Sequence, residues 1–200
     1  MVAIITGDII NSDKSKPDIW LPILKDVLNM YGKSPSKWKI YRGDSFQVEL
    51  KPKEALYGSI LIKASIKQIE NLDARMAIGI GDKEYKARNI TESNGSAFVN
   101  SGRCFEALKK NNLAVKSPWE DFDLQINTML ELALLTMDRW TSTSSVVLQQ
   151  TMLHPKVNQN ALAKKMDKKQ SNISGALNRG GYYRILKMID FYEKNMIERC

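Results

Sequence analysis

Two aspartates stand where the chain could do metal chemistry. Asp8 comes directly after Gly7 at the end of the apolar run Val2 to Thr6, and Asp44 follows Gly43 at the tip of a hairpin pattern. If the hairpin pairs beside the first strand, the two carboxylates converge. Hard cations such as Mg²⁺ prefer oxygen ligands. We therefore take Asp8 and Asp44 as candidate Mg²⁺ ligands, with the alternative that Gly-Asp is simply the ordinary composition of a turn.

A second candidate site lies near the end of the chain, between Asn158 and Arg179. Its apolar spacing predicts two short helices around a tight turn, with Asn158 capping the first. The positions that would face inward are Leu162, Ala163, Met166, Ile173, Ala176 and Leu177. Short polar side chains then face outward on the second helix, where they could contact base edges, while neighbouring lysines contact phosphates. The candidate DNA-binding residues are Lys164, Lys165, Lys168, Lys169, Gln170, Ser171, Asn172, Gly175, Asn178 and Arg179.

This stretch resembles the helix-turn-helix of many bacterial regulators, and the resemblance implies double-stranded DNA as the partner. Two positions depart from the usual pattern. Asp167 replaces the turn glycine, although Asp tolerates a left-handed backbone better than most residues. Lys168 stands where an apolar residue usually packs. The alternative interpretation is a helical hairpin that binds another protein.

The charge distribution favours a polyanionic partner at the same end of the chain. The protein has 200 residues and a net charge of +8. Residues 151–200 hold ten Lys and Arg against four Asp and Glu, a net of +6, and residues 1–150 hold twenty against eighteen, a net of +2. Two cysteines cannot build a disulfide framework and are typical of a reducing cytoplasm. No segment is long and apolar enough to span a membrane, so we expect a cytoplasmic protein without a membrane partner.

The elements expected around these sites alternate between strand and helix before the chain becomes wholly helical. Strands are predicted at residues 2–6, 38–41, 46–50, 74–80 and 113–116, and helices at residues 18–30, 53–71, 95–110, 121–140 and 182–196, besides the two short ones. This order predicts an α/β (α+β) fold, a mixed sheet covered by helices and followed by an all-α domain. We expect domains at 1–118 and 141–200, joined by a helix at 119–140.

The N-terminal motifs resemble the palm-like catalytic domain of class III nucleotide cyclases. The matching segments, in the same order, are Asp8 to Ser12, Gly43-Asp44, Arg75 to Ile80 and Gly95 to Arg103. The resemblance implies that the two aspartates hold metal, and it makes Asn11, Ser12 and Arg103 candidate nucleotide-binding residues.

The catalytic residues of that family match less well than its scaffold. Asn100 and Arg103 are three residues apart, whereas the cyclase pair is usually four apart, and Ile40 stands where a base-reading lysine is usual. We therefore expect little or no cyclase turnover.

Taken whole, the chain resembles the SatD family of bacterial proteins, which implies a cyclase-like domain fused to a DNA-binding domain. The favoured function is a cytoplasmic DNA-binding regulator whose N-terminal domain senses a ligand such as a nucleotide with Mg²⁺. A homodimer is expected because helix-turn-helix proteins commonly bind two half-sites. The rivals are a nucleotide cyclase or related phosphotransferase with a DNA-binding appendage, and a non-catalytic protein-interaction module.

Overall fold

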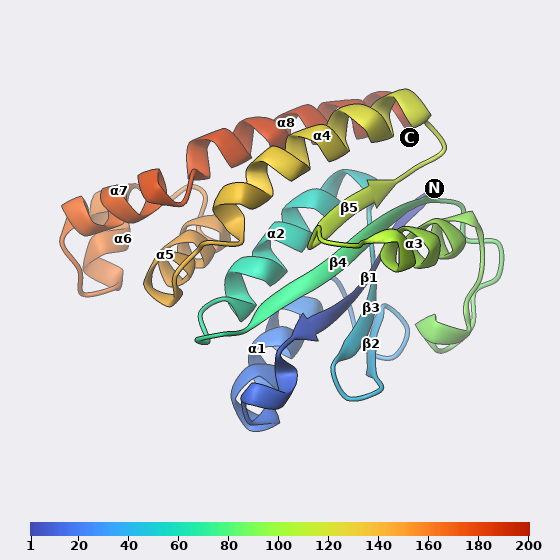
Figure 1. Ribbon diagram of the computed structural model, residues 1–200, viewed down its shortest axis with the longest axis horizontal. Coiled ribbons are helices and arrows are strands. Elements are labelled where there is room, and N and C mark those ends of the chain that lie inside the picture. Colours follow the sequence, from blue (N-terminus) through green and yellow to red (C-terminus); the bar gives the residue numbers. More distant parts are fainter.

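The computed structural model describes all 200 residues as a five-stranded mixed sheet with helices on both faces and a helical layer beyond one edge (Figure 1). The strands are β1 (Val2–Ile10), β2 (Trp38–Tyr41), β3 (Ser45–Leu50), β4 (Asp73–Gly81) and β5 (Leu113–Lys116). The helices are α1 (Pro17–Asn29), α2 (Ala55–Ile66), α3 (Ser96–Ala107), α4 (Glu120–Met137), α5 (Ser142–Leu153), α6 (Gln159–Lys165), α7 (Gln170–Arg179) and α8 (Tyr182–Arg199). The expected α+β architecture is confirmed.

Strand β1 lies at the centre of the sheet, whose order is β2-β3-β1-β4-β5. It pairs antiparallel with β3 and β4, and β5 joins the far side of β4 in parallel. Successive side chains of β1 point to opposite faces of the sheet, as they do in any β-strand. Ala3, Ile5 and Ile9 belong to the main core with α1 and α2, whereas Ile4 packs with Ala97 of α3.

The first strand is longer than predicted, so Asp8 lies inside it and not at its end. Gly7 does not open a turn. A Cβ built on Gly7 would lie 2.6 Å from the ring of Phe46 and 2.8 Å from the side chain of Met76. The glycine is therefore required by close packing between neighbouring strands, which composition alone could not distinguish from a turn.

Three helix predictions also need correction. The helix expected at residues 18–30 runs from Pro17 to Asn29, and Lys16, not Asp18, occupies its N-cap position. The expected helix over 53–71 divides into a 3₁₀ turn at Pro52–Glu54 and α2, which ends at Ile66. Helix α5 was not predicted at all, because its Ser- and Thr-rich first turn is typical of a loop.

The C-terminal helices pack onto the sheet layer and not apart from it. Helices α4 and α8 lie side by side, with Arg199 of α8 bonded to Asp121 at the start of α4. Helix α5 contacts both α2 and α7. One apolar cluster of 45 buried residues continues from β1 to α8. The division into domains at 118 and 141 stays a prediction. None of the helices has the length and apolar character needed to cross a membrane.

A buried ion cluster joins these layers. The ammonium of Lys63 (α2) is fully buried and lies 2.7 Å from a carboxylate oxygen of Asp73, at the start of β4, and 2.7 Å from one of Asp138, directly after α4. Lys67 adds a bond of 2.8 Å to the Asp138 carbonyl and an ion pair of 3.2 Å to Asp73. Opposite charges that are buried together orient the three elements towards one another.

We expect Lys63→Met to lower the free energy of unfolding by about 3–5 kcal/mol, because it removes the fully buried ammonium from Asp73 and Asp138 and leaves only Lys67 beside Asp73. The matched control is Lys51→Met, whose side chain forms an exposed pair with Glu54 and should change stability by less than about 1 kcal/mol. Urea denaturation of both variants measures the difference. Equal losses would show that the buried cluster contributes no more than a surface pair.

Candidate functional site

Helix α7 presents one buried face and one polar face. Its inward side chains are Ile173, Ala176 and Leu177, all at most 2% exposed. Its outward residues include all the side chains expected to contact DNA on this helix. Those exposed to solvent are Gln170, Ser171, Asn172, Asn178 and Arg179, with Gly175 half-buried among them. Ser174 borders the same face and was not anticipated. The predicted division of this helix into inner and outer faces is confirmed.

The turn between α6 and α7 also follows the sequence pattern. The Asn158 side chain caps α6 by accepting the N–H of Ala161 at 2.9 Å. Asp167 has φ of 50°, the left-handed conformation that its place at the usual glycine position predicted. The N–H of Lys168 donates to the carbonyl of Ala163 at 2.9 Å, which closes the turn. Only four residues therefore separate the end of α6 from the start of α7.

Gly175 lies in the middle of α7, where glycine lowers the stability of a helix. Glycine in a helix interior is less favourable than alanine by roughly 0.5–1 kcal/mol. No packing constraint requires it, since a Cβ there would meet only the guanidinium of Arg179, at 3.1 Å. Its effect is to leave room for the guanidinium of Arg179 against the backbone of α7.

A chain of amide groups fixes the start of α7. Gln170 donates to the side-chain oxygen of Gln159, at the start of α6, at 2.7 Å. Gln159 in turn donates to the hydroxyl of Tyr183 in α8 at 2.7 Å. Gln159 and Tyr183 were not among the expected site residues. Their signal in the sequence is weak, because the contacts join residues 11 and 24 positions apart.

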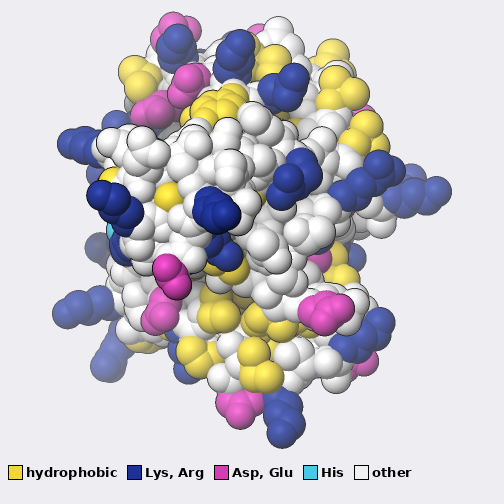
Figure 2. Space-filling view, turned by 90° about the vertical axis from the view of Figure 1, so that its left-hand side faces the viewer, with side chains coloured by type: hydrophobic (Ala, Val, Ile, Leu, Met, Phe, Trp, Pro, Cys, Tyr) yellow, Lys and Arg dark blue, Asp and Glu magenta, His cyan; other side chains and the backbone are white.

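The surface around α7 is basic and unneutralised. Lys164, Lys165, Lys168, Lys169 and Arg179 are all exposed. None of the five forms an ion pair with a carboxylate. Figure 2 views this end of the molecule and shows Lys and Arg side chains projecting around a patch of uncharged atoms. An anion that approached this face would meet free positive charge around a polar, hydrogen-bonding centre.

In the sheet, the two candidate metal ligands are bound by different partners. Asp8 accepts two bonds from Arg75 on the neighbouring strand, at 3.2 Å from Nε and 2.6 Å from Nη2. These bonds raise the pKa of Arg75, whose guanidinium also lies 4.8 Å from the ring centre of Phe105 on α3. Asp44 instead accepts the hydroxyl of Ser12 at 2.5 Å. The structure thus brings Ser12 and Asp44 together, and it pairs Asp8 with an arginine.

This geometry gives limited support for a cation. No group of three or more His, Cys, Asp or Glu side chains gathers here or elsewhere in the molecule. A metal at Asp8 would have to compete with the bidentate guanidinium of Arg75, a strong pairing for a carboxylate. Mg²⁺ at Asp8 and Asp44 stays a prediction, and no chemical step is derived through it.

The three candidate nucleotide-binding residues lie in two places. Asn11 has φ of 60°, and its amide donates to the carbonyl of Asn71 at 2.9 Å. Ser12 lies beside Asp44 at the β2–β3 turn. Arg103 is on α3 and lines a cavity against β5, at the opposite edge of the sheet. Within one chain, Arg103 therefore does not join the Asn11–Ser12 loop.

The cavity beside Arg103, here called the α3–β5 cavity, has a volume of about 550 Å³. Its lining residues are Asn100, Arg103, Cys104, Ala107, Leu108, Lys109, Lys110, Asn111, Ala114, Val115, Lys116 and Asn127. Four of these are cationic and none is a carboxylate. Burial raises the pKa of the Cys104 thiol to about 11, with a smaller contribution from Asp123, so this cysteine stays protonated and poorly nucleophilic at neutral pH.

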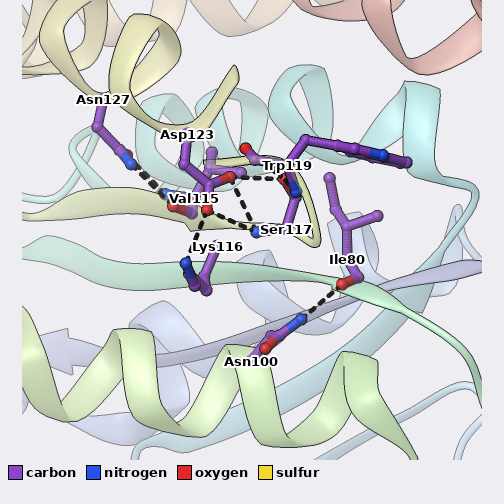
Figure 3. Close-up of polar contacts among 8 residues, drawn as sticks. All are labelled: Ile80, Asn100, Val115, Lys116, Ser117, Trp119, Asp123 and Asn127. Atoms are coloured by element: carbon purple, nitrogen blue, oxygen red, sulfur yellow. Dashed lines mark hydrogen bonds and ion pairs between the residues drawn. The ribbon is translucent and has the colours of Figure 1, made fainter. Parts of the chain in front are cut away.

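Helix α4 contributes Asn127 to the lining of this cavity, and Figure 3 shows the polar contacts of Asn127 and its neighbours. The amide of Asn127 accepts the N–H of Val115 and donates to its carbonyl, both at 2.8 Å, which satisfies the open edge of β5. Asp123 accepts bonds from the Ser117 backbone and hydroxyl and lies 3.2 Å from the Lys116 ammonium. Below them, Asn100 donates to the carbonyl of Ile80 at 2.8 Å. Of the four basic side chains of the cavity, Lys116 is held in place by this polar network through Asp123.

Comparison of the chain with protein-family models, curated proteins and solved structures found no match. The resemblances to nucleotide cyclases and to the SatD family stay predictions from the sequence motifs.

Proposed function

We propose that this protein is a DNA-binding regulator in which α6 and α7 form a helix-turn-helix and α7 is the recognition helix. One observation carries the proposal: the outward face of α7 is short-chained, polar and free of carboxylates, and unpaired lysines and an arginine border it. Lysines would contact phosphates and fix the register, whereas Gln170, Ser171, Asn172 and Asn178 would contact base edges. The Gln159 contact supports this role, because it holds Gln170 in one orientation at the start of the helix.

The absence of a side chain at Gly175, where only the flexible side chain of Arg179 lies nearby, is a second argument for DNA over a protein partner. A recognition helix enters the major groove along its length, and a missing side chain at its centre allows a closer approach. A protein-binding helix gains its affinity from large buried anchors such as Trp, Tyr and Leu. The outward face of α7 offers none of these.

For the N-terminal domain we propose a palm-like fold that senses an anionic ligand such as a nucleotide. The β-α-β-β-α-β order of its first six elements supports that fold. The α3–β5 cavity supports the ligand, because it combines an apolar floor with Arg103, Lys109, Lys110 and Lys116. A ring system could lie on the floor while phosphates contact the cations. The enzyme alternative, a cyclase or phosphotransferase, has less support, since Asp8 is paired with Arg75, and Asp44 is not among the residues that line the cavity with Arg103.

Substitution of a phosphate-contacting residue and of a base-contacting residue should change DNA affinity in different ways. Lys169→Ala should weaken binding to every duplex and reduce the slope of log K against log salt by about 0.9. Asn172→Ala should cost roughly 1–3 kcal/mol on a selected site and much less on random DNA. Lys25→Ala on exposed α1 is the matched control. A salt-titrated series on a selected and a scrambled duplex measures all three, and full-length protein that binds neither duplex at low salt would refute the proposal.

Gly175→Ala should change stability and DNA binding in opposite directions. The helix should gain up to about 1 kcal/mol of stability, while the added methyl group on the outward face lowers affinity for DNA. Gly102→Ala is the matched control, because Gly102 lies in α3 with no atom within 4 Å of its missing Cβ. That variant should gain stability with unchanged DNA affinity. Thermal unfolding and the same binding assay decide the matter, and unchanged DNA affinity in Gly175→Ala would contradict a close approach at this position.

Nucleotides should stabilise the protein through the α3–β5 cavity. A nucleoside triphosphate at 100 times its dissociation constant should add about 2.7 kcal/mol to the stability. Arg103→Ala should remove most of this gain, whereas Arg88→Ala, an exposed arginine outside the cavity, should not. Thermal shifts with ATP and GTP, each with and without Mg²⁺, provide the measurement. Equal shifts in the two variants would remove Arg103 from the ligand site, and pyrophosphate release that Asp44→Asn abolishes would favour the enzyme alternative.

A further inference from the structure

The most exposed large apolar side chains of the protein are three leucines on one helix. Leu124, Leu132 and Leu135 of α4 are 72%, 66% and 64% exposed, more than any other large apolar residue in the chain. Leu124 and Leu135 are eleven residues apart, which is close to three turns, so they lie on the same side of the helix about 16 Å apart. The inner face of α4 is already buried through Phe122, Ile126 and Leu130. The face of α4 that carries Leu124, Leu132 and Leu135 therefore does not contribute to the hydrophobic core.

Two of the three leucines and the charged residues of this face match one another when two copies of α4 run antiparallel, whereas Leu132 falls opposite Asn127. If the second helix runs in the opposite direction and the two helices cross between positions 129 and 130, Leu124 of one copy lies opposite Leu135 of the other. Thr128 then lies opposite Glu131. The same arrangement places Glu120 opposite Arg139. Both of these charged residues are exposed, and neither forms an ion pair within the chain. A two-fold interface needs this property, because the same patch must match itself.

The groove next to this face has its basic side chains at the same end of α4 as Arg139. It lies between α4 and α8, has a volume of about 410 Å³ and is lined mainly by apolar residues such as Met129, Met188 and Phe191. Its basic side chains, Arg184 and Lys187, belong to the first turns of α8, beside the end of α4. Glu120, which is exposed and unpaired, begins α4 at the other end, whereas Asp121 beside it is bound to Arg199 of the same chain. Antiparallel copies would therefore bring each acidic end towards a basic end.

We propose that the exposed face of α4 is the interface of a homodimer, with the α4 helices of two copies of this chain packed antiparallel about a two-fold axis. The interface is inferred independently of the proposed function. Only its biological role depends on that function, because a dimer would offer two copies of α7 to one DNA duplex. The charge pattern favours a second copy over an unrelated protein, because it is complementary to itself end for end.

The experiment is sedimentation of the full-length protein over a range of concentrations. Wild-type protein should sediment as a dimer. Leu135→Lys should raise the dissociation constant at least about 100-fold, because every leucine occurs twice in a two-fold interface. The matched control, Ile19→Lys, changes an exposed apolar residue on α1 and should leave the dimer intact. Circular dichroism of each variant confirms that it is folded.

A charge exchange tests the antiparallel direction. At low salt, Glu120→Arg and Arg139→Glu should each weaken the dimer by roughly 3- to 30-fold, since like charges would then face one another twice. The double variant Glu120→Arg/Arg139→Glu should restore wild-type association. Parallel packing would give no such rescue, because each residue would then face its own copy. A wild-type monomer, or a dimer unaffected by Leu135→Lys, would overturn the proposal.

The dimer proposal and the DNA-binding proposal can be refuted independently of each other. A monomeric Leu135→Lys variant should still bind a single half-site through α7, with weaker binding to a two-site duplex. If the protein dimerises through α4 but binds no DNA, the proposed function fails and this inference stands. If it binds DNA as a monomer, the inference fails alone.

Discussion

The buried ammonium of Lys63 is the constraint on which the arrangement of the layers depends. A charge with no exposed surface is tolerated only beside opposite charge, and here Asp73 and Asp138 supply it from two other elements. The end of α2, the start of β4 and the end of α4 must therefore meet at one point. Residue 138 is also where the chain leaves α4 towards α5. The path of the C-terminal helices is thus set at the edge of the sheet.

Further contacts carry this constraint to the proposed recognition helix. The indole of Trp140, two residues after Asp138, donates to the carbonyl of Gly180 at the end of α7 at 2.9 Å. Gln149 of α5 donates to the Ser65 hydroxyl in α2 at 3.1 Å. Each contact joins the sheet layer or its helices to the segment that holds α7. These contacts form a continuous packed connection from α2 and α4 to α7.

The sequence predicted local features well and contacts between distant residues poorly. The five strands, the α6–α7 pair and the left-handed turn at Asp167 follow from periodicity, capping and turn chemistry, all of which act over a few residues. The Asp8–Arg75 pair joins residues 67 positions apart, and no local pattern reports it. Gly7 illustrates the same limit, because its role is set by Phe46 and Met76 on the neighbouring strands. Helix α5 was missed because packing against α2 and α7 outweighs its weak helical propensity.

The distribution of charge bears on why a cyclase-like pattern favours sensing over catalysis in this chain. Phosphoryl transfer needs carboxylates free to hold metal and cations aimed at the transferring group. Here Asp8 is neutralised by Arg75 within the sheet, and the cations of the α3–β5 cavity lie at the opposite edge from Asp44. A cavity with several cations and no carboxylate can still bind an anion, because binding needs only complementary charge. The distribution of charge therefore supports the proposed binding of an anion more than the alternative of catalysis.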